Sequence, residues 1–298
     1  TKKLSYDITL EEDETDVMGF LNSIFPDPQL LRMMLQILAS ALIPLEPPRL
    51  LLSLYGSGAN GKSVFVRLIM CLFEHLAVEL SGDVFKVSHT RDSNSASPSL
   101  LPLLNSRIAF CLEPSKQKLC SSMVKKLCGG GDTIVCRPLY SNTPIYFKNI
   151  ATMMVACNDI ITFDEVDEAM ASRMIIIPFM RIFVSHPKHK NERLIDYSIS
   201  NKIYDNENYK KGLMSHLIKM LMTLPLSTGI RIDIAPNTLN FQNTQQESLA
   251  RFELWLRDHI CSGTKQNVLK FKTIYDAYFP YLGAFGDKAK YREYLARF

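Results

Sequence analysis

Hydrophobic residues in this chain gather in short runs that are separated by segments of helical length. Four runs have the pattern of buried strands, at residues 50–55, 107–112, 151–157 and 174–179. Each run is apolar at nearly every position, which is typical of strands that are covered on both faces. Buried strands with helices between them predict an α/β core with a mainly parallel sheet.

Helical segments are expected on both sides of this core. Residues 16–47 carry apolar residues at three- and four-residue spacing and end in a proline-rich stretch, which predicts a small helical subdomain over 1–47. Further helices are expected over 64–73, 121–128, 211–224 and 245–260. Pro236 marks the next boundary, so the core spans 48–235 and a mostly helical, truncated region of winged-helix type spans 236–298.

A glycine-rich loop follows the first strand and precedes a helix. It reads Gly56, Ser57, Gly58, Ala59, Asn60, Gly61, Lys62, Ser63, and Val64 continues into the helix. Glycines let successive backbone N–H groups point inward at phosphate oxygens, and the helix adds its positive end. In this pattern Lys62 reaches the β- and γ-phosphates and the Ser63 hydroxyl ligates Mg²⁺. The loop therefore predicts that the chain binds a nucleotide with magnesium.

Three more polar residues lie at ends of the predicted strands. Glu113 follows the second strand, Asn158 follows the third, and Arg173 directly precedes the fourth. A glutamate here could hold Mg²⁺ or activate water, an asparagine could orient that water, and an arginine could neutralise charge on a transferred phosphoryl group. Singly, each also fits an ordinary strand end, turn or surface position. Their order after the glycine loop favours the catalytic interpretation.

A long hairpin is predicted where residues 133–136 and 144–147 flank a turn-rich tip at 138–143. Cations and an aromatic residue surround it: Lys125, Lys126, Arg137, Tyr140 and Lys148. Such residues suit a single nucleic-acid strand, because charges track the phosphates and a ring stacks on a base. The alternative is a solvated hairpin with solubilising charges, and the pattern alone favours that alternative.

Composition adds few constraints. The chain has 298 residues, 47% of them hydrophobic, and a net charge of +4, which is too small to establish a polyanionic partner. No signal peptide opens the sequence, and the apolar stretch 30–45 is too short to span a bilayer. The seven cysteines form no CxxC pair. They are expected to be buried free thiols in a reducing compartment.

The order of these motifs resembles that of superfamily 3 helicases. It is most similar to the primase-helicases of nucleocytoplasmic large DNA viruses, of poxvirus and asfarvirus type, with relatives in phages. The segments that carry the resemblance are GSGANGKS, LEP, VKKLCGGGDTIVCRPLY, MMVACN and SRMIIIPF. The similarity covers residues 17–185 well and the region after 236 loosely.

The resemblance implies an AAA+-like P-loop ATPase that forms a hexameric ring with ATP and Mg²⁺ between subunits. Lys62 and Ser63 match the Walker A residues, Glu113 the Walker B acid and Asn158 the sensor asparagine. Arg173 matches an arginine finger that acts on the neighbouring subunit's ATP. Lys125, Lys126 and Arg137 fall in the motif between the Walker B acid and the sensor, a region that in this family carries a hairpin which grips single-stranded DNA in the ring channel.

Two departures qualify the resemblance. Leu112 precedes Glu113 where many relatives have two acids, so one carboxylate has to serve metal and water together. Ser172 precedes Arg173 where relatives often pair two arginines, and Arg181 is the fallback finger.

The chain begins without Met and ends within an expected helix, so we expect a piece of a larger protein. The resemblance implies an upstream primase domain, viral replication proteins as partners, no membrane, and a location in the cytoplasm of the infected host cell. Two other functions stay open: another P-loop enzyme such as a nucleotide kinase, and a nucleotide-gated DNA clamp that does not hydrolyse ATP.

Overall fold

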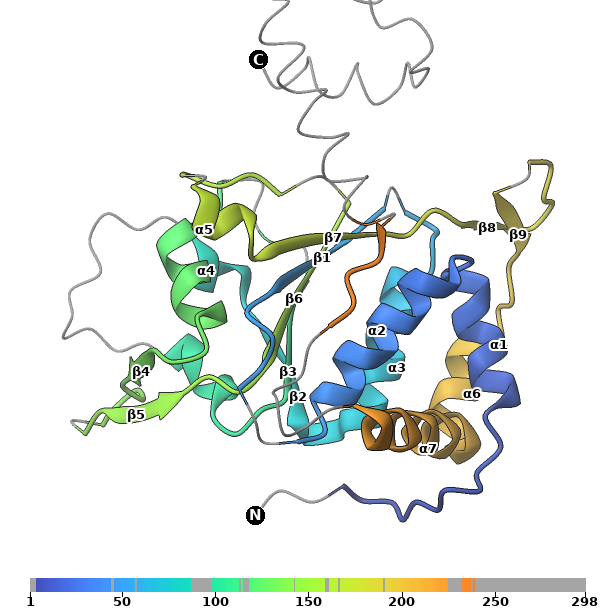
Figure 1. Ribbon diagram of the computed structural model, residues 1–298, viewed down its shortest axis with the longest axis horizontal. Coiled ribbons are helices and arrows are strands. Elements are labelled where there is room, and N and C mark those ends of the chain that lie inside the picture. The colour runs from blue at the N-terminus through green and yellow to red at the C-terminus, as the bar shows by residue number, and fades with distance from the viewer. Residues whose placement is uncertain are drawn as a thin grey trace, which may run out of the picture. The chain divides into compact units, whose positions relative to one another are not determined.

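Five parallel strands form the central sheet of the computed structural model (Figure 1). They are β1 (Leu51–Tyr55), β2 (Ala77–Leu80), β3 (Ile108–Leu112), β6 (Thr152–Cys157) and β7 (Met174–Pro178), in the order β2-β3-β6-β1-β7. The predicted α/β class with a parallel sheet is confirmed. The four predicted strands are β1, β3, β6 and β7. Edge strand β2 was not predicted, because its Ala-Val-Glu-Leu sequence is short and is interrupted by a charged residue.

The structure describes residues 4–43, 46–56, 58–86, 98–112, 114, 118–141, 143–158, 161–165, 167–189, 191–224, 232–236 and 238. Residues Thr1–Phe241 form one compact unit. The predicted helix over 245–260 and nearly all of the predicted region 236–298 lie outside the described residues. The domain boundaries at 47 and 235 stay predictions.

Helices cover both faces of the sheet (Figure 1). One face carries α1 (Thr15–Ile24), α2 (Pro28–Ser40), α3 (Lys62–Phe73), α6 (Ile199–Asp205) and α7 (Glu207–Thr223). The other carries α4 (Ser121–Cys128) and the antiparallel hairpin of β4 (Thr133–Cys136) and β5 (Ile145–Lys148). The predicted hairpin is therefore confirmed. Short α5 (Glu168–Ala171) precedes β7, and the parallel pair β8 (Ile182–Val184) and β9 (Glu192–Leu194) follows it.

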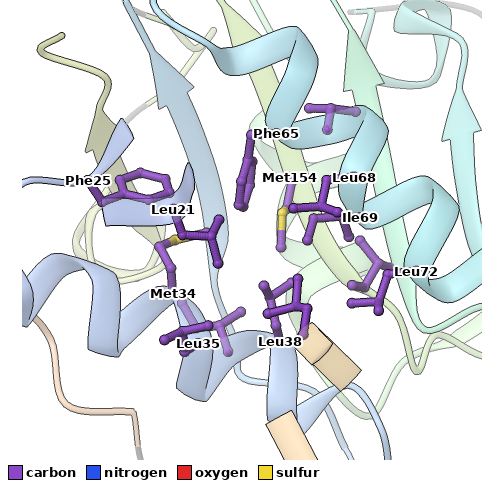
Figure 2. Packing of buried hydrophobic residues seen from close by; sticks show 14 of the residues in the cluster. Leu21, Phe25, Met34, Leu35, Leu38, Phe65, Leu68, Ile69, Leu72 and Met154 are labelled. Atoms are coloured by element: carbon purple, nitrogen blue, oxygen red, sulfur yellow. The ribbon is translucent and has the colours of Figure 1, made fainter. Parts of the chain in front are cut away.

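Successive side chains of each strand point to opposite faces of the sheet, so the interior contains two hydrophobic cores, one on each face. In β1, Leu52 and Leu54 face the core with α1, α2 and α3, whereas Leu51 faces the core with α4 and the hairpin. Figure 2 shows Leu21, Met34 and Leu68 among the side chains that meet in the first core. The N-terminal helices thus share one core with the helix that follows the glycine loop.

Local signals explain where the elements begin. Helix α2 starts at Pro28, and the Asp27 side chain accepts a hydrogen bond from the Gln29 N–H at 2.9 Å. Three short 3₁₀ helices fill connections: Glu74–Leu76, Gly82–Phe85 and Pro98–Leu103.

Two smaller expectations also concern the described residues. None of the helices there is both long enough and apolar enough to cross a bilayer. The six described cysteines are free thiols and four of them are buried, as predicted, whereas Cys261 lies outside the described residues.

Candidate functional site

The glycine loop connects the end of β1 to the start of α3, as predicted. Gly58 and Gly61 have φ angles of 106° and 83°, which residues with a Cβ rarely adopt. Gly61 is also the N-cap of α3, so the loop curls directly into the positive end of that helix. Ser57 lies outside the described residues. The backbone shape is therefore the one that a phosphate-binding loop requires.

Lys62 lies inside the loop with only 7% of its surface exposed. Its ammonium donates to Asn158 Oδ1 at 2.9 Å, to Asn60 Oδ1 at 3.4 Å and to the Gly56 carbonyl. Because β1 and β6 are paired with Tyr55 opposite Cys157, the loop and Asn158 leave the sheet side by side. The structure thus brings Lys62 and Asn158 together at the carboxyl edge of the sheet, where open parallel sheets bind ligands.

Apolar residues from α1, from α3 and from the segment after β7 pack together next to the glycine loop. Phe25 at the end of α1 makes edge contacts with Phe65 and Phe179, with ring centroids 5.4 and 4.9 Å apart. Ile24 packs against Gly61, and the Phe183 N–H of β8 donates to the Ala59 carbonyl at 2.7 Å. Sequence reasoning missed this support. The only signal was an apolar stripe that is equally typical of any core helix.

One of the two predicted magnesium ligands lies among the described residues. Ser63 is the second residue of α3 and its side chain is exposed beside the loop. Among the described residues no group of three or more His, Cys, Asp or Glu could hold a metal. Mg²⁺ usually keeps several waters and binds one or two protein groups plus substrate phosphates, so a sparse donor set suits it. Glu113, the other predicted ligand, lies outside the described residues.

Arg173 lies at the opposite edge of the sheet. Its carbonyl accepts from the Leu51 N–H at 2.7 Å, where β1 begins, whereas the glycine loop starts where β1 ends. The five residues of β1 separate the two edges by about 16 Å, at about 3.3 Å per residue. Arg173 therefore does not reach Lys62 of its own subunit. Arg181 follows β7 and lies on the same edge as the loop.

The Arg173 guanidinium is held close to the protein. Nη1 donates to the Ala169 carbonyl, and Nε is buried with no hydrogen-bond partner. It also lies near Cys128: burial raises the pKa of that thiol to about 12, and the charge of Arg173 opposes the rise. A buried N–H without a partner is costly, so Nε is an unsatisfied donor in this arrangement.

The hairpin leaves the sheet at the same edge as Arg173, because β5 leads directly into the start of β6. Ile134 and Cys136 face the core, and Val135 and its cross-strand partner Tyr146 face outward with 42% and 65% exposure. At the tip Tyr140 is fully exposed. Sequence reasoning selected Tyr140 but missed Tyr146, which the strand alternation at 145–148 could have identified.

The predicted cations of this region have different surroundings. Lys125 and Lys126 lie on α4 rather than on the hairpin, and Lys125 pairs with Asp167, whose pKa its hydrogen bond lowers. Lys148 is exposed and stands opposite Thr133. Arg137 follows β4 directly and is partly buried.

Fold and loop together define a P-loop, helicase-like α/β protein. The C-terminal region (residues 305–718) of NrS-1 has this fold, with a TM-score of 0.52 and 19% sequence identity over 77% of this chain and 49% of that one. No family model matches the sequence.

Sequence relatives make the class more specific. The chain is 32% identical over 228 residues to a protein of Acanthamoeba polyphaga mimivirus that is provisionally named helicase L207/L206, and the match covers 70% of this chain. It is 27% identical over 174 residues (57% of this chain) to the provisionally named helicase 022R of Frog virus 3. It is 25% identical over 215 residues (67% of this chain) to Primase D5 of Fowlpox virus.

The predicted resemblance is therefore confirmed. The chain is a homologue of proteins named as helicases and a primase of nucleocytoplasmic large DNA viruses, which is consistent with a superfamily 3 helicase-like domain. It spans only 22%, 18% and 26% of the lengths of those three relatives.

Proposed function

We propose that this chain is the ATP-hydrolysing motor of a viral DNA helicase, which acts as a ring on single-stranded DNA. One observation carries the proposal. Lys62 and Asn158 meet beside a phosphate-type loop at one edge of the sheet, and Arg173 lies at the other. Homologues with helicase and primase names give the general setting of viral replication.

In this proposal the residues at the carboxyl edge of the sheet have distinct roles in binding and hydrolysis. The backbone N–H groups of 58–63 and Lys62 bind the phosphates of ATP, and the Ser63 hydroxyl and Glu113 hold Mg²⁺. When bound, the magnesium ion neutralises charge on the phosphates. Asn158 orients the attacking water, and Glu113 takes its proton. The contact between Asn158 and Lys62 supports the assignment of both residues to one phosphate group.

Completion of the site requires a second subunit. Arg173 is too far from its own loop to act there, so it serves the ATP of the neighbouring protomer. A head-to-tail contact of this kind joins one edge of each subunit to the opposite edge of the next and closes into a ring. We propose a homo-oligomer, with a hexamer as the expected size.

Single-stranded DNA is the proposed track. The hairpin presents Tyr140 and Tyr146 for stacking on bases and Lys148 for contact with phosphates. We also propose an upstream primase domain on the same polypeptide, viral replication proteins as partners, and action in the cytoplasm of the infected host cell.

Measurement of phosphate release with and without single-stranded DNA tests this function against its alternatives. We expect magnesium-dependent ATP hydrolysis that rises when single-stranded DNA is added. A phosphorylated nucleoside product would instead favour a nucleotide kinase. Binding of ATP and DNA without release of phosphate would favour a nucleotide-gated clamp.

A further inference from the structure

The side chain of Asn60 occupies the inside of the glycine loop. Only 3% of the residue is exposed, although its side chain is polar. Its Oδ1 accepts from the Lys62 backbone N–H and from Lys62 Nζ, both at 3.4 Å. Both Lys62 groups can only donate, so the oxygen of the Asn60 amide has to face them.

Gly56 makes room for this arrangement. A Cβ atom at Gly56 would lie 1.9 Å from Asn60 Nδ2, so the amide group lies directly against the glycine backbone. The loop therefore encloses the Asn60 side chain between Gly56 on one side and Lys62 on the other.

The donors that Asn60 engages are the ones a phosphate uses. In a phosphate-binding loop, backbone N–H groups and the lysine ammonium bind phosphate oxygens. The partners of Lys62 Nζ include three protein oxygens, from Gly56, Asn60 and Asn158. A phosphate that binds Lys62 therefore competes with these oxygens for the same donor.

Asn60 is the partner that is easiest to replace. Its two contacts of 3.4 Å are longer than ordinary N–H···O bonds, and Asn158 lies closer to Nζ at 2.9 Å. A phosphate oxyanion would form shorter, charge-assisted bonds with the same donors.

We propose that Asn60 is an internal competitor of the nucleotide phosphate. Its amide oxygen fills the phosphate position and keeps Lys62 and the loop in a receptive shape, and the side chain leaves when phosphate binds. The competition multiplies the nucleotide affinity by the fraction of time that Asn60 leaves the position empty. This inference rests on the proposed function, because it requires that the loop binds a nucleotide.

Calorimetric titration of ADP with Mg²⁺ into the wild-type chain, Asn60→Ala and Asn60→Asp tests the proposal. We expect Asn60→Ala to bind ADP about three- to tenfold more tightly, since two weak hydrogen bonds no longer compete. Asn60→Asp has the same shape but adds a negative charge beside the phosphate, and we expect binding at least about tenfold weaker. Asn60→Ser has its acceptor on a shorter side chain, and we expect its ADP affinity to lie between those of wild type and Asn60→Ala.

The outcome of these titrations distinguishes a failure of this inference from a failure of the proposed function. If wild type binds ADP and a folded Asn60→Ala variant binds equally or less tightly, Asn60 is a scaffold and not a competitor. If Asn60→Ala does not fold, Asn60→Ser decides by the same criterion. If wild type binds neither ADP nor ATP, the nucleotide site itself is wrong and this inference falls with it.

Discussion

The two edges of the central sheet differ in the kind of residues that each presents within one chain. At the carboxyl edge Lys62 is buried, and its ammonium donates to oxygens of the loop and of Asn158, which follows β6. At the starting edge Arg173 directly precedes β7, and the neighbouring hairpin exposes two tyrosines. The first edge has the features of a ligand site, and the second has those of a surface that acts on something outside the subunit.

This difference has a physical origin in the strands. All five strands run in the same direction, so every loop that follows a strand lies at one edge and every segment that precedes one lies at the other. Asn158 follows β6, whereas Arg173 precedes β7. A motor that used both edges for a single ATP would have to pair the edges of two subunits.

Removal of the Lys62 ammonium should have the largest effect. We expect Lys62→Ala to reduce ATP hydrolysis to background, because the loop loses its only side-chain cation at the phosphates. The measurement is phosphate release at saturating ATP, with circular dichroism as the check that the variant is folded. Hydrolysis that persists within a few-fold of wild type would show that the loop edge is not the catalytic one.

Loss of the Arg173 guanidinium should be nearly as severe but different in kind. We expect Arg173→Ala to lower kcat by about a thousandfold and to leave ADP affinity within about threefold, since a finger acts mainly in the transition state. Arg181→Ala is the matched control, because Arg181 lies on the loop edge. A larger loss of kcat in Arg181→Ala than in Arg173→Ala would place the arginine finger on the loop edge and contradict the assignment of Arg173.

Much of this comparison could be predicted from sequence, but its geometry could not. The apolar runs at 50–55 and 151–157 were sufficient to predict parallel strands with the loop and Asn158 at their ends, but not that these two strands are neighbours in the sheet. The support from Ile24 and Phe25 was not predictable, because an apolar stripe does not show what it packs against. The direction of the Asn60 side chain also depends on loop geometry that spacing does not encode.

The exposed tyrosines of the hairpin should have the next largest effect. Tyr146→Ala should weaken binding to a single-stranded oligonucleotide by about 1–3 kcal/mol, the usual contribution of one base stacked on an aromatic ring. Fluorescence anisotropy at fixed salt measures this. Val135→Ala is a matched control, since Val135 stands opposite Tyr146 on the same face without a ring. Equal effects of the two variants would argue against stacking.

Removal of one positive charge from the hairpin should have the smallest effect on single-strand binding. Lys148→Ala should weaken single-strand binding and reduce the slope of log affinity against log salt by about 0.7, the value for one phosphate contact on a single strand. Lys125→Ala should change the slope less, because Lys125 already pairs with Asp167. Anisotropy titrations at several salt concentrations distinguish the two lysines, and an unchanged slope for Lys148→Ala would remove it from the DNA surface.

A subunit-mixing experiment tests the central claim most directly, that one edge of each subunit completes the site of the next. Lys62→Ala and Arg173→Ala chains are each expected to be inactive alone. When they are mixed, an interface that joins the loop of an Arg173→Ala subunit to the Arg173 of a Lys62→Ala subunit is intact, so ATP hydrolysis should partly return. If assembled mixtures recover no hydrolysis at any ratio, the two edges do not share a site.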